Sequence, residues 1–388
     1  MNEHEVEMLR VQLAGLGRAW TPQDVAVALR GLGLVVSDAM VLYAVEALRR
    51  GSVGAGRLEP LLRLPGLTDV LVNGPDQVLM DRGLGLEPTG VVFESDDEVR
   101  RLATRLAASV GRRLDDACPF VDARLADGTR LHAVLSTIAD PGTCLSLRVP
   151  AQRSFAIADW VVNGSITEPM AALLRALMAS RAAFLVSGGT GSGKTTLLAG
   201  LLGLVPAGQR LLIVEDSREL APDHPHCVRL ECRAPNSEGA GAITMTDLVR
   251  QALRMRPDRL VLGEVRGGEL CDLLTALNTG HEGGCGTVHA NSVRDVPARL
   301  EALAALGGLG REACHAQVAA ALRVVVQVAR LPDGRRSVTE LGVVRRATSG
   351  HVVIETAVAC PDGRRLRPGP AFDELAELTG VSTGGEAA

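Results

Sequence analysis

Aromatic side chains are scarce in this sequence of 388 residues, since Phe, Trp and Tyr together make up 2%. Proteins that bind single-stranded nucleic acid stack the bases on aromatic side chains, and this sequence has few aromatic residues with which to build such a surface. The 41 Lys and Arg residues are outnumbered by 45 Asp and Glu residues, which gives a formal net charge of −4. The arginines form no long basic run, which a DNA-binding face would require. The composition therefore argues against a direct nucleic-acid partner.

Long hydrophobic runs are also missing. No segment reaches the roughly 18 uninterrupted apolar residues of a transmembrane helix. The acidic start of the sequence, residues 1–7, lacks the basic and apolar regions of a signal peptide. The eight cysteines include no C-x-x-C pair, so we expect free thiols rather than a zinc site. These absences predict a cytoplasmic protein that reaches a membrane only through partner proteins.

Lysine is almost absent as well, because Lys194 is the only lysine in the chain. It lies in a G-x-x-x-x-G-K-[ST] motif between an apolar run, 183–186, and a helical pattern, which together predict a phosphate-binding P-loop. Glycines let backbone N–H groups converge on phosphate oxygens, and the following helix directs its positive end at them. Lys194 would reach the β- and γ-phosphates, and the Thr195 hydroxyl would bind Mg²⁺. The predicted nucleotide-binding residues are Gly188, Gly189, Thr190, Gly191, Ser192, Gly193, Lys194, Thr195 and Thr196.

The remaining pattern predicts an α/β protein. Apolar residues recur at helical spacing before a glycine-rich hinge at 51–56. Short strands separated by turns then surround an amphipathic helix from Asp96 to Val110, which is typical of a compact domain with an antiparallel sheet. Apolar strands and helices alternate further on, which predicts a parallel nucleotide-binding core. The expected parts are a helical region (1–57), an α/β domain (58–150), a linker (151–168), the ATPase core (169–345), and C-terminal strands with a flexible tail (346–388).

Two more patterns bear on this division. Short strands are predicted at 69–72, 77–80, 121–125, 129–134 and 145–149 in the first domain, and at 183–186, 211–214, 260–262 and 287–289 in the core. Residues 323–328 and 343–355 suggest closing strands near the end of the core.

Polar side chains follow the core strands at their carboxyl ends, where ligands of parallel sheets bind. Glu264 fits the Walker B position and would hold Mg²⁺ or its water. Gly263 before it would allow close backbone approach. Either Glu215 or Glu219 would orient the attacking water, and the sequence leaves this choice open. We expect the strand tips to gather around the terminal phosphate if these strands neighbour the P-loop strand.

Two histidines bracket a glycine-rich loop in the same region. His281 precedes this loop and His289 follows the next apolar strand. A structural zinc site would need more ligands at tighter spacing. We therefore interpret both histidines as sensors of the phosphate state beside the γ-phosphate rather than as metal ligands or purely structural residues.

Three segments of the core resemble the Asp box, Walker B box and His box of the type II/type IV secretion ATPase superfamily; these are residues 210–220, 256–269 and 278–292. Upstream segments at 72–76, 111–115 and 121–125 resemble its tight-adherence (Flp) pilus branch. The resemblance covers about residues 58–345.

This resemblance implies a RecA-like P-loop core preceded by a smaller PAS-like domain. It also implies a homo-hexameric ATPase at the cytoplasmic base of a pilus or secretion machine, with an inner-membrane platform protein as partner. Nucleotide would lie between the two domains of one subunit, and N-terminal arginines would close over it. The matching positions are Arg130 and Arg148, together with Arg124.

The sequence departs from the family at three places. Residues 284–286 differ from the usual filling of the His box, the four-cysteine zinc insert is absent, and residues 311–315 replace the signature of retraction motors. Assembly or secretion is therefore favoured over retraction. The sequence predicts an Mg²⁺-dependent ATPase that hydrolyses ATP and swings the first domain against the core. The alternatives are a DNA-translocating or conjugation motor, a non-hydrolysing switch or scaffold, and a small-molecule P-loop kinase.

Overall fold

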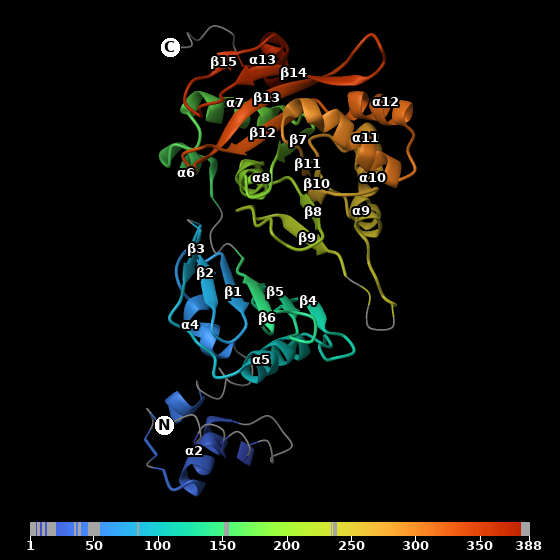
Figure 1. Ribbon diagram of the computed structural model, residues 1–388. Helices are drawn as coiled ribbons and strands as arrows, with labels where there is room; N and C mark the ends of the chain where they lie inside the picture. Colours follow the sequence, from blue (N-terminus) through green and yellow to red (C-terminus); the bar gives the residue numbers. More distant parts are fainter. Residues whose placement is uncertain are drawn as a thin grey trace. The chain divides into compact units, whose positions relative to one another are not determined.

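The computed structural model forms two compact units, Met1–Ala151 and Gln152–Ala388, here called the N-terminal and C-terminal units (Figure 1). It describes residues 21–34, 36–37, 40–45, 55–83, 85–150, 155–233, 235 and 239–381, together with residues 5, 8, 9, 12 and 13. Most of the predicted hinge (51–54) and the predicted tail (382–388) lie outside the described residues.

The first described helix shows why the start of the chain is helical. Helix α2 (Pro22–Gly31) begins at a capping box in which Thr21 and Asp24 satisfy each other's backbone N–H groups. Its apolar residues at helical spacing, Val25 and Leu29, are fully buried. Residues 40–45 are also helical. The helical periodicity predicted here is therefore met where the chain is described.

The N-terminal unit is built on an antiparallel sheet of six strands in the order β3-β2-β1-β6-β5-β4. Buried and partly exposed residues alternate along β1, as expected when one face of the sheet packs on a core. The predicted antiparallel sheet is confirmed, with β3 as a strand that the sequence did not indicate. The elements are η1 (Gly56–Leu58), α4 (Glu59–Leu62), β1 (Asp69–Asn73), β2 (Val78–Asp81), β3 (Leu86–Pro88), α5 (Asp96–Ser109), β4 (Phe120–Arg124), β5 (Arg130–Val134) and β6 (Cys144–Arg148).

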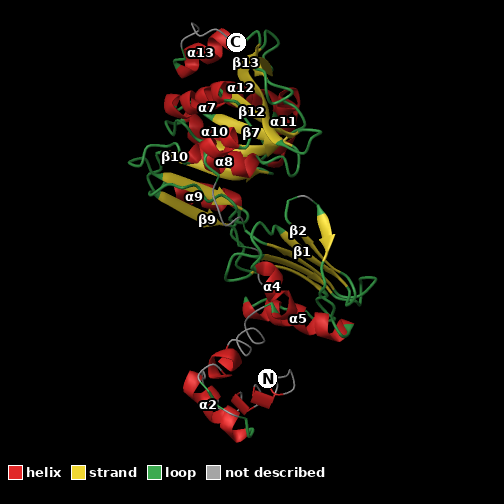
Figure 2. Cartoon of the chain, turned by 90° about the vertical axis from the view of Figure 1, so that its left-hand side faces the viewer, coloured by secondary structure: helices red, strands yellow, loops and turns green. Residues whose placement is uncertain are grey.

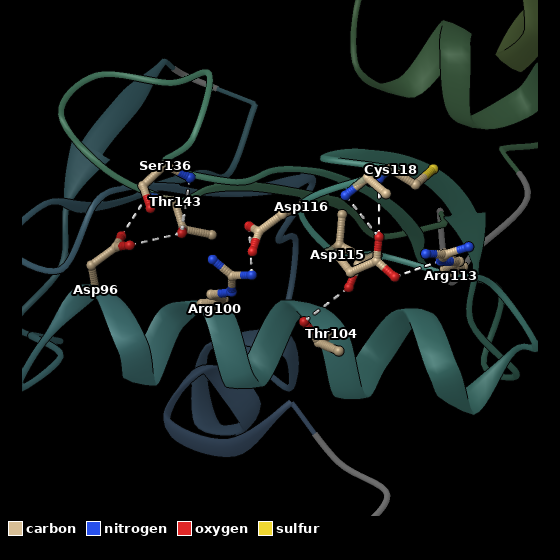
Figure 3. A network of polar contacts seen from close by, with 11 residues as sticks. Asp96, Arg100, Thr104, Arg113, Asp115, Asp116, Cys118, Ser136 and Thr143 are labelled. Atoms are coloured by element: carbon tan, nitrogen blue, oxygen red, sulfur yellow. Dashed lines mark hydrogen bonds and ion pairs between the residues drawn. The ribbon is translucent and has the colours of Figure 1, made fainter.

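Helix α5 covers this sheet and is tied to it at its first residue, Asp96 (Figure 3). Thr143, next to β6, donates both its backbone N–H and its hydroxyl to the Asp96 carboxylate, the latter at 3.0 Å. Burial alone would raise the pKa of Asp96, but these bonds and one from Ser136 outweigh it and lower the pKa below its ordinary value. A Cβ built on Gly142 would lie 2.8 Å from the same carboxylate, so only glycine allows this approach.

The C-terminal unit is built on a nine-stranded sheet in the order β15-β14-β13-β12-β7-β11-β10-β8-β9. The six strands from β12 to β9 are parallel, and the last three along the other side are antiparallel. The strands are β7 (Phe184–Gly188), β8 (Leu211–Glu215), β9 (Cys227–Glu231), β10 (Arg259–Val265), β11 (Cys285–His289), β12 (Val324–Arg330), β13 (Arg336–Arg346), β14 (Val352–Ala359) and β15 (Arg367–Pro368).

Helices cover both faces of this sheet (Figures 1 and 2). One apolar core joins the sheet to α6, α7, α8 and α13, and a second joins its other face to α9, α10, α11 and α12. Every residue of β7 is buried, as the continuous apolar run predicted. The helices are α6 (Ile157–Val162), α7 (Glu168–Ser180), α8 (Lys194–Leu202), α9 (Met245–Leu253), α10 (Glu269–Asn278), η2 (Val293–Asp295), α11 (Val296–Leu306), α12 (Arg311–Ala321) and α13 (Phe372–Thr379).

Closing strands were predicted at residues 323–328 and 343–355, and strands lie in both ranges. The second range contains the end of β13, a turn and the start of β14. The turn forms because Gly350 adopts a φ of 84°, and the Ala347 N–H donates to the His351 carbonyl at 2.8 Å. Strand β13 also continues past residue 345, which was the predicted end of the ATPase core. Strand β9 was not predicted.

Candidate nucleotide-binding site

The P-loop lies between β7 and α8, at the carboxyl edge of the parallel strands (Figure 1). Gly191 and Gly193 have φ values of 68° and 98°, which few other residues adopt. A Cβ on Gly188 would lie 2.3 Å from the carbonyl oxygen of Val328, so the loop begins where only glycine fits. The structure therefore gives these glycines the conformational role that the motif predicted.

Lys194, the sole lysine, is the first residue of α8. Its side chain is only 8% exposed, and Nζ donates to the carbonyl oxygens of Gly188 and Gly189 at 3.0 and 2.9 Å. An ammonium group held among backbone carbonyls is positioned without a direct carboxylate partner, which suits it for contact with an anion.

Three charged side chains act on this ammonium group. Burial has the largest influence on the pKa of Lys194 and holds it below the ordinary value. Glu264 and Glu219 act in the opposite direction through their negative charges, and Arg266 lowers the pKa further. Glu264, near the end of β10, and Glu219, in the loop after β8, therefore carry the negative charges that act on Lys194.

Glu264 lies near the end of β10, which extends to Val265 rather than ending at 262 as predicted. Its carboxylate accepts a hydrogen bond from Arg266 Nη2 at 2.7 Å. Arg266 also lies 3.7 Å from Asp216, so one guanidinium links Glu264, near the end of β10, with Asp216, which follows β8. This pairing orients Glu264 at the carboxyl edge of the sheet.

Glu215 is almost fully buried at the end of β8. Its Oε1 accepts the backbone N–H groups of Glu219 and Leu220, both at 2.8 Å, and its Oε2 lies 3.7 Å from Arg229. Burial raises the pKa of Glu215 above its ordinary value, although these contacts oppose the rise. Its side chain lies against Gly263, where a Cβ would come within 2.5 Å of Cγ. Glu215 thus fixes the turn that carries the exposed Glu219.

The order of the strands corrects one condition of the sequence argument. Of the strands whose tips were expected to meet the phosphate, only β11 is a direct neighbour of the P-loop strand. His289 ends β11 and pairs in register with Gly188, the first glycine of the P-loop. Strands β10 and β8 lie one and two positions further along the sheet. Their acids therefore reach the site from the side rather than from adjacent strands.

His281 lies at the amino ends of the parallel strands, opposite the carboxyl ends that carry the P-loop. It precedes β11, whose first residue pairs with the first residue of β7. The neighbouring Gly284 carbonyl accepts the Phe184 N–H at 3.3 Å, which places this loop at the amino ends of the strands. The expectation that both histidines flank the γ-phosphate therefore does not hold for His281 in this chain, because β11 separates it from His289.

Two residues at the P-loop were missed by the sequence argument. Arg336, on β13, donates from Nε to the carbonyl oxygen of Gly191 at 3.1 Å. Gln327, on β12, is 4% exposed and is bonded to Ser187, directly before the loop. A glutamine inside a run of valines was the available signal, since a buried amide requires partners.

The three predicted arginines form a row on the sheet of the N-terminal unit. Arg124 lies opposite Arg130 on β4 and β5, and Arg130 lies opposite Arg148 on β5 and β6. Residues directly opposite in an antiparallel sheet share one face. The three arginines therefore lie side by side on one face of this sheet.

The oxygen donors near the P-loop fit magnesium. Thr195 offers a hydroxyl in the first turn of α8, and Glu264 offers a carboxylate. Mg²⁺ prefers oxygen ligands and takes one or two from the protein, with phosphates and water supplying the rest. Within the described part of the chain, no cluster of three or more His, Cys, Asp or Glu residues could hold a metal by itself. Thr195 and Glu264 are thus the residues that would hold the ion.

All eight cysteines have free thiols. Among the described residues, no helix has the length and apolar character that crossing a membrane requires.

Comparison with known proteins places this site in a family. The model for Type II/IV secretion system proteins matches residues 52–366. A putative conjugal transfer protein of Mycobacterium tuberculosis is 54% identical over 319 residues, covering 81% of this chain and 91% of that protein. The probable conjugal transfer protein TrbB of Sinorhizobium fredii is 30% identical, covering 75% and 87%.

A solved structure agrees at the level of the fold. The Legionella pneumophila ATPase DotB superposes with a TM-score of 0.51 at 18% identity, covering 76% of this chain and 81% of DotB. Since the family model matches residues 52–366 and a relative that is 54% identical covers 81% of the sequence, the chain belongs to the Type II/IV secretion system protein family.

Proposed function

We propose that this protein is an Mg²⁺-dependent ATPase that drives a secretion or pilus machine. The observation that carries the proposal is the grouping around Lys194. The only lysine of the chain begins the P-loop helix, and the charges of Glu264 and Glu219 act on it. A loop built only to bind phosphate needs no acids beside its lysine, whereas hydrolysis needs a metal partner and a group that orients water.

The residues divide the work as follows. The P-loop N–H groups and Lys194 hold the terminal phosphates, with the positive end of α8 directed at them. Thr195 and Glu264 would hold Mg²⁺, which would supply positive charge against the charge that develops on the phosphates. Glu219 accepts a hydrogen bond from the attacking water, because it is exposed and acts on Lys194. His289 reports the phosphate state through the strand next to the P-loop.

Glu215 is the alternative residue for orienting water, and its raised pKa would suit a general base. Its Oε1 is occupied by two backbone N–H groups, which favours a structural role. Comparing Glu219→Gln with Glu215→Gln separates the two assignments. We expect Glu219→Gln to lower kcat with the melting temperature unchanged, and Glu215→Gln to lower both.

The arginine row supports a role for the N-terminal unit in turnover. We propose that Arg130 and Arg148, with Arg124, bind phosphate oxygens and that hydrolysis moves this unit to do mechanical work. Arg130→Ala should lower kcat by about tenfold or more. Arg101→Ala, which removes an exposed arginine from α5 of the same unit, is the matched control and should leave turnover unchanged.

Steady-state ATP hydrolysis tests the proposal directly. Lys194→Ala and Glu264→Gln should each lower kcat by roughly 100-fold or more, as loss of one preorganised electrostatic group usually does. Glu377→Gln makes the same chemical change as Glu264→Gln on the exposed surface of α13 and should be neutral. Near-normal hydrolysis by Lys194→Ala or Glu264→Gln would refute the assignment.

The machine itself is proposed from the family. A homo-hexamer that acts at the cytoplasmic face of a membrane through an inner-membrane platform protein is the arrangement that the sequence resemblance implies. The tight-adherence pilus branch remains part of this proposal. Solution mass with and without ATP would test the ring, since a particle that remains monomeric under both conditions contradicts it.

Conjugation is the second candidate, because two of the relatives described above are named as conjugal transfer proteins. A motor that contacts DNA should hydrolyse ATP faster when DNA is added, and this stimulation should fall steeply with salt. A secretion motor should show no such stimulation. Assays at two salt concentrations with double-stranded DNA therefore separate the candidates.

A further inference from the structure

Gln327 is an unusual residue for its place. It lies in β12, where the surrounding residues are valines, and it is 4% exposed. Burying an amide is unfavourable unless its donors and its acceptor find partners. The positions of those partners indicate what the side chain does.

The Gln327 amide bonds to two other segments of the unit. Its Oε1 accepts the hydroxyl of Ser187, in β7. Its Nε2 donates to the carbonyl oxygens of Ala290 and Asn291, at 3.4 and 3.1 Å. Because carbonyls can only accept, the amide cannot turn over without placing Oε1 against two oxygens. The side chain therefore has one orientation, with Nε2 directed at the segment that follows β11.

All of these partners adjoin the nucleotide site. Ser187 directly precedes Gly188, and Ala290 and Asn291 directly follow His289. In the sheet, Gln327 pairs in register with Ser187, and His289 pairs with Gly188. Strand β7 thus lies between β12 and β11, and the Gln327 side chain spans it at the base of the P-loop. One amide fixes the end of β11 relative to the loop.

We propose that Gln327 is a positioning residue for ATP hydrolysis, which holds His289 and the segment after it in register with the P-loop. The inference rests on the proposed function. Gln327 would not touch nucleotide, because its donors and acceptor are directed at protein groups. Its loss would let the segment after β11 shift while the phosphate-binding loop stays folded. Binding should survive, and the chemical step should suffer.

The test compares Gln327→Met with Ser187→Ala. Methionine keeps the length and approximate volume of glutamine but cannot hydrogen-bond to the carbonyls. Ser187→Ala removes only the bond to Oε1 and leaves both carbonyl bonds. We expect Gln327→Met to lower kcat by about tenfold to 100-fold, with KM for ATP within about threefold of the parent, since displaced groups slow chemistry more than binding. Ser187→Ala should stay within about threefold in both.

Amide hydrogen exchange gives a readout that does not depend on hydrolysis. Peptides covering residues 287–292 should exchange faster in Gln327→Met than in the parent, and Ser187→Ala should resemble the parent. If the parent protein does not hydrolyse ATP, the proposed function fails and this exchange measurement still decides the structural part of the inference. Unchanged exchange and unchanged kcat in a folded Gln327→Met protein would overturn the inference and leave the proposed function standing.

A second variant covers the case in which Gln327→Met does not fold. In Gln327→Glu, an ionised carboxylate would face the Ala290 and Asn291 carbonyls, whereas the protonated acid can donate one hydrogen bond to them. Turnover relative to the parent should therefore rise as the pH falls from about 8 to about 6, because burial raises the pKa of a carboxyl group. A ratio that does not change with pH would count against the positioning role.

Discussion

Adding one methyl group at Gly263 should displace the acid that organises the loop beside Lys194. Gly263 lies in β10, and a Cβ at this position would come within 2.5 Å of Glu215 Cγ and 3.2 Å of Glu215 Oε1. Ordinary contacts of this kind begin near 3.4 Å, so Glu215 must retreat by about 1 Å. The φ of Gly263 is not in the positive range, so alanine adds no backbone strain. The effect of Gly263→Ala is therefore purely steric.

The magnitude follows from what Glu215 holds. Its Oε1 accepts two backbone N–H groups at 2.8 Å, from Glu219 and Leu220. A hydrogen bond to a charged group is worth about 1.5 to 3 kcal/mol, and a shift of about 1 Å would weaken both bonds substantially. We expect Gly263→Ala to lower the free energy of unfolding by about 2 kcal/mol. Melting of the C-terminal unit should occur roughly 4 to 8 °C lower.

Activity should fall as well, because the N–H of Glu219 is one of the two groups that Glu215 fixes. Displacement of a catalytic group by about 1 Å can cost up to 100-fold in rate. Steady-state ATP hydrolysis and thermal melting should be measured on the same preparation. Gly208→Ala is the matched control, because a Cβ there would meet no described atom within 4 Å. It should match the parent in both measurements.

The outcome that would refute this reasoning is a Gly263→Ala protein with normal melting and normal kcat. Such a result would mean that Glu215 can move without disturbing the turn, and hence that it does not organise Glu219. A drop in kcat with unchanged melting would instead assign Glu215 a direct part in the chemistry.

Three further predictions concern stability, nucleotide binding and thiol reactivity. Asp96→Asn should lower the free energy of unfolding by about 1 to 2 kcal/mol at pH 7. The folded-state pKa of Asp96 is lowered from 3.8, so the parent should lose this advantage as the pH falls below about 3.8, which urea titrations at several pH values would show. Trp160 lies against the P-loop, 3.4 Å from where a Cβ of Gly193 would be, and it is the only tryptophan in a Trp20→Phe protein. The fluorescence of Trp160 in this protein should change saturably with MgATP. The absence of any change would contradict this placement. Burial raises the pKa of Cys285 to about 12, so iodoacetamide should label this thiol at pH 8 only after unfolding. Labelling of the folded protein at the rate of an exposed thiol would show that the core opens.

The fold was largely predictable where local pattern is strong. The segments at 121–125 and 145–149 alternate apolar and polar residues, and the apolar run at 69–72 is followed by a turn signal; the structure has antiparallel strands at all three places. The continuous apolar runs of the core became parallel strands because helices cover both faces of that sheet. Strand β9 escaped notice because Cys227–Glu231 is short and partly exposed along its whole length, and so lacks the continuous apolar run of the other core strands.

The site was predictable only in part. The P-loop has a fixed spacing, because a tight turn and a helix start require certain residues at certain places. The position of His281 could not be predicted from spacing, because it lies only eight positions before His289 in the sequence. The intervening strand β11 nevertheless places the two histidines at opposite ends of the parallel strands. Gln327 lies more than 130 residues from Ser187, and no local pattern joins them.

By itself, the sequence determined that this protein has an α/β core with a phosphate loop at Lys194, because backbone conformation and hydrophobic period are local properties. Only the tertiary structure decided which side chains surround that lysine. Strand order is set by packing between segments far apart in the chain, and it placed His289 next to the loop, brought Glu219 and Glu264 in from the side, and aligned Arg124, Arg130 and Arg148 in one row.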